Sequence, residues 1–179
     1  MNVERAHTFL AGVLPQYDWE SEHLRGTPQR FAQLLSDLTS NHVDWKFTTF
    51  QSDVDEMIIV KDVAFYSLCA HHLIPFFGTA AVAYVPQGKI AGLSKLVRTI
   101  QTSAKTLTSQ EQLTWDIHDL VDSTLHPLGT AVSMQARHLC MEMRGVRSPG
   151  SATTTQKLSG CFREKPEARA EFLSALGRT

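Results

Sequence analysis

Residues 56–86, EMIIVKDVAFYSLCAHHLIPFFGTAAVAYVP, decide the fold, because two strand-like segments flank a short stretch of cysteine and histidine. The segments Glu56–Ser67 and Phe77–Pro86 are rich in β-branched and aromatic residues, as strands tend to be. Val43–Gln51 precedes them with a similar composition, and Gly129–Met143 also has a strand-like pattern. The sequence therefore predicts a sheet of several strands.

Helical patterns lie before, between and after these strands. Thr27-Pro28 is typical of a helix start, Ser94 can cap a second helix, and Ser109 with Gln112 forms a capping box for a third. A last short helix is expected near Glu167–Leu176. Because helices and strands do not alternate as in a parallel β-α-β protein, we expect an α+β fold. Its antiparallel sheet would carry two adjacent helices on one face, with an N-terminal helix.

The composition is that of one ordinary globular domain. The chain has 179 residues, of which 42% are hydrophobic and 20% charged, and its net charge is −1. Neither a positive field for nucleic acid or membrane binding nor a run of roughly 20 apolar residues is present. Only three cysteines occur, which favours reduced thiols, and the N-terminus lacks a signal-peptide pattern. We therefore expect a cytoplasmic protein with no nucleic-acid or membrane partner.

Cysteine and histidine at metal-ligand spacing form a candidate zinc site. Cys69 and His72 lie three residues apart at a strand end, so both can point at one ion across a tight turn. Cys140, on a later predicted strand, can add a third ligand once the chain folds. Three protein ligands leave tetrahedral zinc an open position, as in catalytic sites. The alternative is buried cysteines and scattered histidines, but His138 beside Cys140 favours metal binding.

Two more histidines, His71 and His138, lie next to these candidate ligands. On a strand, His138 and Cys140 would point to the same face. His138 can then lie beside zinc without binding it, where it is suited to acid–base chemistry near neutral pH. A lone histidine is more often a hydrogen-bonded core residue, but the neighbouring thiolate favours a functional role.

A candidate phosphate site follows at Ser94, Lys95 and Arg98. The two cations share a helix face near free backbone N–H groups, and Arg144 adds a cation beyond Cys140. From the residues alone, a solvated helix face is the simpler interpretation.

Gln110 and Glu111 occupy the first turn of the helix that Ser109 caps. The helix dipole favours a carboxylate there whatever the function. Glu111 could equally accept hydrogen bonds from guanine N1–H and the 2-amino group, with Gln110 reading another edge atom. The residues alone leave both explanations open.

Together these segments resemble GTP cyclohydrolase I, in the same order along the chain from about residue 25 onward. The stretches that carry the resemblance are TPQRFA (Thr27–Ala32), DEMIIVKDVAFYSLCAHHLIPFFG (Asp55–Gly78), AYVP (Ala83–Pro86), GLSKLVR (Gly92–Arg98), QEQLT (Gln110–Thr114), HLCMEMRGVR (His138–Arg147), SATTT (Ser151–Thr155) and EFLSAL (Glu171–Leu176).

The resemblance implies the tunnelling fold, in which sheets and paired helices assemble into a homo-oligomeric ring, typically a decamer, with active sites between subunits. It implies one domain over residues 1–179, with 1–25 as a short N-terminal extension, and GTP as substrate. The implied roles are zinc binding by Cys69, His72 and Cys140, catalysis by His71 and His138, triphosphate binding by Ser94, Lys95, Arg98 and Arg144, and guanine binding by Gln110 and Glu111.

The implied reaction is zinc-dependent hydrolysis of GTP at purine C8. Zinc supplies a hydroxide near neutral pH, and His138 protonates N7 as this hydroxide adds to C8. The imidazole ring opens and a second hydrolysis releases formate. Rearrangement of the ribose and ring closure, with His71 as a proton carrier, then yield 7,8-dihydroneopterin triphosphate. Folate, other pterins and 7-deazaguanine bases can all begin from this product.

Two positions depart from the family pattern. Ala70 stands where the family usually has glutamate, and Gln135 where an acid is common. Because the zinc ligands and both histidines are retained, we expect an active enzyme. One alternative is a related hydrolase with an altered substrate or product, and another is a guanine-nucleotide-binding protein without turnover. A nucleic-acid-binding zinc module is excluded, since a second ligand pair and a basic surface are missing.

Overall fold

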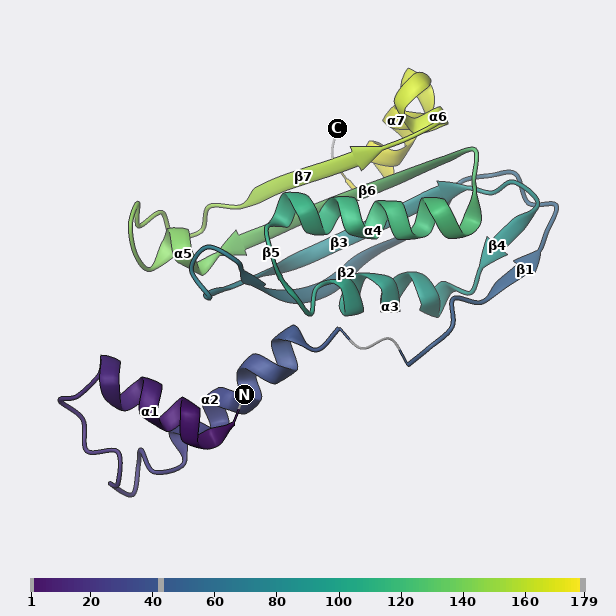
Figure 1. Ribbon diagram of the computed structural model, residues 1–179. Coiled ribbons are helices and arrows are strands. Elements are labelled where there is room, and N and C mark those ends of the chain that lie inside the picture. Colours follow the sequence, from purple (N-terminus) through teal and green to yellow (C-terminus); the bar gives the residue numbers. More distant parts are fainter. Residues whose placement is uncertain (1, 42–43, 178–179) are drawn as a thin grey trace. The chain divides into compact units, whose positions relative to one another are not determined.

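A computed structural model describes residues 2–41 and 44–177, which belong to two compact units, Met1–Ser40 and Asn41–Thr179 (Figure 1). The first unit contains α1 (Val3–Val13) and α2 (Thr27–Thr39). Phe9 of α1 stacks on Phe31 of α2, with ring centroids 6.5 Å apart. The helix predicted from Thr27-Pro28 is thus confirmed, whereas α1 was not predicted.

The second unit is built on a five-stranded sheet in the order β5-β2-β3-β6-β7. All neighbouring strands are antiparallel except β5, which is parallel to β2. The strands are β2 (Ile58–Cys69), β3 (Pro75–Val85), β5 (Leu107–Thr108), β6 (Gly129–His138) and β7 (Thr153–Leu158), and a separate pair comprises β1 (Thr49–Gln51) and β4 (Lys89–Ala91).

Two helices, α3 (Leu93–Ser103) and α4 (Gln110–Leu125), lie side by side on one face of the sheet (Figure 1). The larger apolar core is buried between them and the sheet, with Phe65 and Phe76 from the strands and Ile100 and Ile117 from the helices. Three short helices complete the unit: α5 (Leu139–Glu142), α6 (Cys161–Glu164) and α7 (Pro166–Ala175). The predicted α+β fold with an antiparallel sheet and two adjacent helices is confirmed.

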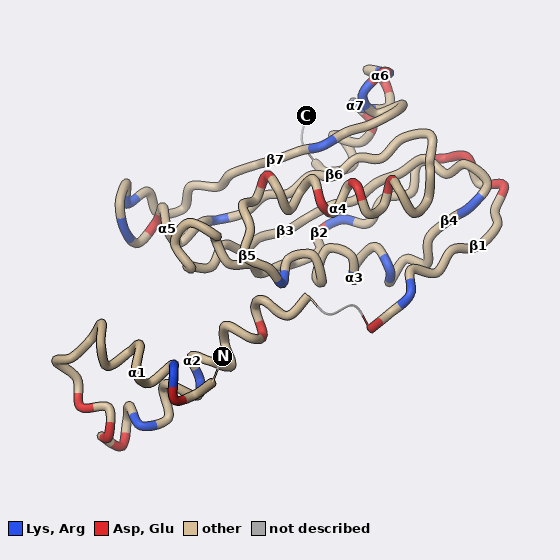
Figure 2. Tube along the Cα trace, viewed as in Figure 1, with Lys and Arg blue, Asp and Glu red and all other residues tan. Residues whose placement is uncertain are grey.

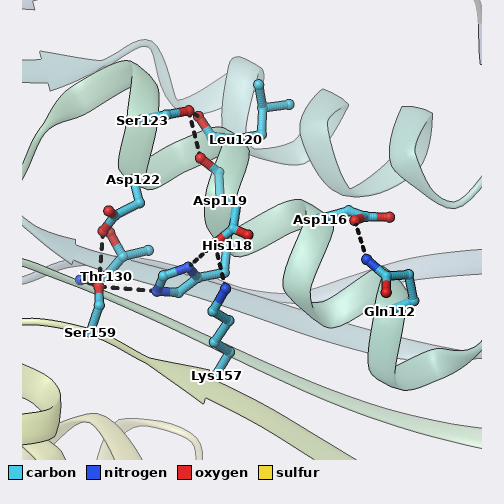
Figure 3. A network of polar contacts seen from close by, with 10 residues as sticks. All are labelled: Gln112, Asp116, His118, Asp119, Leu120, Asp122, Ser123, Thr130, Lys157 and Ser159. Atoms are coloured by element: carbon cyan, nitrogen blue, oxygen red, sulfur yellow. Dashed lines mark hydrogen bonds and ion pairs between the residues drawn. The ribbon is translucent and has the colours of Figure 1, made fainter.

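Polar contacts fix α4 to the β7 edge of the sheet (Figure 3). His118 is 2% exposed, and its Nδ1 donates to Asp119 while its Nε2 lies 3.0 Å from the Ser159 hydroxyl. Lys157 of β7 donates to the same Asp119 carboxylate. These contacts hold the C-terminal half of α4 against β7 and the residues that follow it.

Three local predictions need correction. Within the described part of Val43–Gln51 only Thr49–Gln51 is a strand, and Val43 itself lies outside the described residues. Ser94 lies inside α3, which is capped by Gly92 without a side-chain hydrogen bond. The strand predicted over Gly129–Met143 ends at His138, where the chain turns into α5. None of the helices in the described ranges is long and apolar enough to cross a bilayer.

Candidate active site and metal centre

The β2–β3 connection brings two of the predicted metal ligands together. Cys69 closes the turn through its backbone, donating to Ile74 and accepting from Leu73 at 3.0 and 2.8 Å. Leu73 adopts a positive φ of 54°, which is unusual for a branched side chain and is typical of strained turns at functional sites. In this turn the Cys69 sulfur lies 3.6 Å from Nδ1 of His72 and 3.8 Å from Nδ1 of His71.

Cys140 reaches the same place from α5, immediately beyond the end of β6. Arg137 braces the corner between strand and helix, donating two hydrogen bonds of 2.7 and 2.6 Å to the Glu142 carboxylate. Arg137 thereby lowers the pKa of Glu142, and Glu142 raises that of Arg137. The corner explains why Cys140 faces the turn although it is not on a strand.

The three side chains fit a zinc ion. The ligand atoms of Cys69, His72 and Cys140 all lie within 4.8 Å of one another. Zinc bonds of about 2.3 Å to sulfur and 2.0–2.1 Å to nitrogen, at a tetrahedral angle, place those two atoms about 3.6 Å apart. The Cys69–His72 distance of 3.6 Å matches this value. Two thiols and an imidazole are also the donors that zinc prefers.

Electrostatics at the cysteine pair also favour a cation. Burial raises the pKa of the Cys140 thiol, and the neighbouring Cys69 raises it further. Two thiolates this close repel each other unless a positive charge lies between them. A divalent cation reverses the effect, because a coordinated thiol is deprotonated. The Arg144 charge opposes this shift and lowers the Cys140 pKa in part.

A cavity of about 230 Å³ opens beside the cysteine pair and contains both predicted catalytic histidines. Its lining comes from the β2–β3 turn, the start of α4, the end of β6 and the start of β7, and comprises Cys69, His71, His72, Phe76, Thr108, Ser109, Gln110, Glu111, His138, Cys140, Met141 and Thr153. The predicted metal ligands, histidines and guanine-binding pair thus line one cavity.

His138 is held by two contacts that the sequence pattern did not reveal. Its ring stacks on Phe76 with centroids 4.9 Å apart and an interplanar angle of 1°. Its Nε2 lies 2.7 Å from Oε1 of Gln110. Burial lowers the pKa of His138, and the nearby Glu111 carboxylate opposes this shift. The stacking follows from the β3–β6 register, which pairs Phe76 directly with His138 and is not visible in either segment alone.

Three of the predicted phosphate-binding residues lie elsewhere, on α3, whereas Arg144 closely follows α5. Ser94, Lys95, Arg98 and Arg144 are not among the side chains that line the cavity. Ser94 and Arg98 are exposed, and the Lys95 ammonium lies 5.7 Å from the ring centre of Trp45. Figure 1 shows α3 beginning beside β4, at the opposite end of the sheet from the start of α4. Figure 2 likewise shows Lys and Arg on α3 and after α5, at separate ends of the sheet. One chain therefore brings the metal and base-binding candidates together at the end of the sheet where Arg144 also lies, but it does not bring Ser94, Lys95 and Arg98 of α3 there.

Comparisons with known proteins agree with these features. A family model described as GTP cyclohydrolase I matches residues 5–177. GTP cyclohydrolase 1 from Hydrogenobaculum sp. (strain Y04AAS1) is 44% identical over 175 residues, covering 97% of this chain and 95% of that protein. GTP cyclohydrolase 1 from Aquifex aeolicus (strain VF5) is 45% identical over 166 residues, covering 92% and 89%. The archaeosine synthase QueF-Like in the apo form aligns with a TM-score of 0.48 and 16% identity, over 62% of this chain and 97% of that one.

Proposed function

Because the chain belongs to the GTP cyclohydrolase I family, we propose that it hydrolyses GTP at purine C8 and converts it to 7,8-dihydroneopterin triphosphate. The observation that carries the proposal is the cluster of Cys69, His72 and Cys140 beside His138 in one cavity. A binding protein without turnover would not need a histidine held next to a metal site.

The fold is the tunnelling fold expected for this family, with antiparallel strands and two paired helices on one face. We propose that the chains assemble into a ring, typically a decamer in this family, with the active site between subunits. The separation of the two candidate sets supports this assembly. The cavity of one chain holds the base, and Ser94, Lys95 and Arg98 of a neighbour would supply the triphosphate contacts.

Zinc is the proposed cofactor, held by Cys69, His72 and Cys140. When bound, zinc supplies Lewis acidity that makes hydroxide available near neutral pH. The chain itself holds the nucleotide against this centre. Glu111, in the first turn of α4, would accept hydrogen bonds from guanine N1–H and the 2-amino group. Fixing the base at this edge places C8 in the cavity, and such positioning can lower a reaction barrier by several kcal/mol.

Proton transfer is assigned to the two histidines. His138 gives a proton to N7 as water adds to C8, which allows the bond between C8 and N9 to break and the imidazole ring to open. A second hydrolysis releases C8 as formate. Ribose rearrangement and ring closure follow. His71, which lies on the exposed β2–β3 turn, would carry the protons that these steps transfer. Ala70 lies exposed on the same turn, and we expect the enzyme to work without the carboxylate that the family usually carries there.

The proposal is tested by metal content and formate release in two matched cysteine variants. Cys140→Ala removes a ligand, so zinc content and formate release from GTP should both be lost. Cys161→Ala changes a half-buried cysteine that belongs to no metal cluster among the described residues, and it should retain both. A Cys140→Ala protein that still releases formate at the wild-type rate would contradict the assigned site.

A further inference from the structure

Gln110 starts α4, yet its side chain points into the protein and is only 1% exposed. Its amide nitrogen lies 3.3 Å from the Met134 carbonyl oxygen, 3.0 Å from the Thr153 carbonyl oxygen and 3.0 Å from the Thr155 hydroxyl. Its amide oxygen lies 2.7 Å from Nε2 of His138. The side chain is therefore fully engaged with the protein on both ends of the amide.

The amide has only one orientation that satisfies its neighbours. Two of the groups facing the nitrogen are backbone carbonyls, which can only accept. The third is the Thr155 hydroxyl, whose proton is used elsewhere. The Thr114 hydroxyl donates to the Gln110 carbonyl at 2.7 Å, so the Thr114 oxygen, 2.7 Å from Thr155, must accept the Thr155 proton. All three neighbours are thus acceptors, and the NH2 group must face them.

The oxygen of the same amide consequently faces His138, and an amide oxygen can only accept. The hydrogen of that contact must be on Nε2, which fixes neutral His138 as the Nε2–H tautomer with a lone pair on Nδ1. No hydrogen bond to Nδ1 is found among residues 2–41 and 44–177, and His138 lines the cavity. Phe76 fixes the plane of the ring by stacking. Nδ1 is the ring nitrogen that remains available to a bound nucleotide.

We infer that Gln110 is a positioning residue that holds His138 as the Nε2–H tautomer, so that Nδ1 exchanges the proton with the purine. This inference rests on the proposed function of His138. It replaces the expectation that Gln110 reads the guanine edge. The two N–H hydrogens of the amide are already shared among three protein acceptors, which leaves no donor for a base. Base recognition then falls to Glu111, while Gln110 acts through the histidine.

Kinetics of Gln110→Met, with Gln112→Met as the matched control, test the role. Methionine keeps the length of the side chain but offers no strong acceptor, and Gln112 is exposed on the same helix turn. Loss of a correctly placed proton donor should lower kcat by about 100-fold. The loss should be equal for GTP, for ITP, which lacks the 2-amino group, and for 2-aminopurine riboside triphosphate, which lacks O6. KM should stay unchanged, and Gln112→Met should behave as wild type. A loss seen with one base and not another, or a rise in KM alone, would overturn the inference.

A second readout does not depend on turnover. In zinc-loaded protein carrying 15N-histidine, the His138 signals are assigned by their absence in His138→Asn. Wild-type protein should show a protonated Nε2 and an unprotonated Nδ1, and Gln110→Met should show a mixture of tautomers. A protonated Nδ1 in neutral wild-type His138, or an unchanged tautomer in Gln110→Met, would overturn the inference even if GTP is hydrolysed. Failure of wild-type protein to release formate would instead contradict the proposed function, and the spectra would still decide the tautomer.

Discussion

Replacing Phe76 by leucine should separate the contribution of this ring to the core from its contribution to the active site. Phe76 is fully buried on β3 and contacts two rings, Phe65 at a centroid distance of 6.0 Å and His138 at 4.9 Å. Phe65 is also buried, at 2% exposed, but it has no ring contact with His138 among the described residues. Phe65→Leu is therefore a control with the same chemical change in the same core.

The expected loss of stability follows from the number of ring pairs. A buried aromatic pair contributes about 0.5–1.5 kcal/mol beyond the apolar area it buries. Phe65→Leu removes one pair and Phe76→Leu removes two, so the extra losses are about 0.5–1.5 and about 1–3 kcal/mol. Both substitutions also lower stability because leucine has a smaller volume than phenylalanine, and this loss has the same cause in the two variants. Both variants should remain folded, because typical domains have about 5–15 kcal/mol of stability.

The two variants should differ far more in catalysis than in stability. Without the stacked ring, the His138 imidazole can tilt away from the base, and a small misplacement of a catalytic group can reduce kcat by about 10–100-fold. Phe65→Leu should leave kcat near the wild-type value. Urea unfolding gives the stabilities, and formate release at saturating GTP gives kcat. Equal reductions of kcat in both variants would refute a specific role for the Phe76–His138 stack.

Three further substitutions test other parts of the structure. Gly78→Ala should lower stability by about 1–3 kcal/mol in urea unfolding, because its Cβ would lie 1.9 Å from a backbone oxygen of β6; wild-type stability would contradict the strand spacing. Lys157 lowers the pKa of Asp119, which is 61% exposed, so Asp119→Asn should cost only about 0.5–1 kcal/mol at pH 7. This stabilisation is present above the ordinary carboxyl pKa of about 4 and is lost as the pH falls through the lowered pKa. Urea unfolding should therefore show the stability difference between wild type and Asp119→Asn disappearing in acid, and a stability difference that grows there would contradict the pairing. Glu142→Gln should loosen the brace to Arg137 and weaken zinc binding by about 10-fold in competition with a chelator, and unchanged affinity would argue against the brace.

Local patterns predicted most of the second unit. The composition of β2 and β3 corresponds to the observed strands, and Ser109 caps α4 by accepting from the Gln112 N–H as expected. The Gln112 side chain instead donates to Asp116, so only one half of the predicted capping box is seen. The prediction that Ser94 caps a helix was wrong. Its hydroxyl is typical of a cap, but the residue that caps α3 is Gly92, whose backbone is extended. Capping is decided by backbone geometry as well as by residue type.

The sequence predicted which side chains of the candidate site lie together, but it did not predict the contacts that hold them in place. The spacing of Cys69, His72 and Cys140 was enough to group them, and the structure places their ligand atoms within 4.8 Å. The prediction that Cys140 lies on a strand was wrong, because Cys140 lies on α5. The contacts of His138 with Phe76 and Gln110 join segments 62 and 28 residues apart in sequence (138 − 76 and 138 − 110). Such contacts depend on strand register and helix placement, which one sequence does not display.

Hydrolysis of GTP at purine C8 is tested best by following that carbon through the reaction. Zinc-loaded protein is incubated with GTP that carries 13C at C8, and NMR follows the label while fluorescence after oxidation measures the pterin. All of the label should appear in formate, and formate and pterin should form in equal amounts. Label retained in a ring-opened formamide, or formate without pterin, would contradict the proposed conversion to 7,8-dihydroneopterin triphosphate, and recovery of unchanged GTP would contradict hydrolysis at C8 altogether.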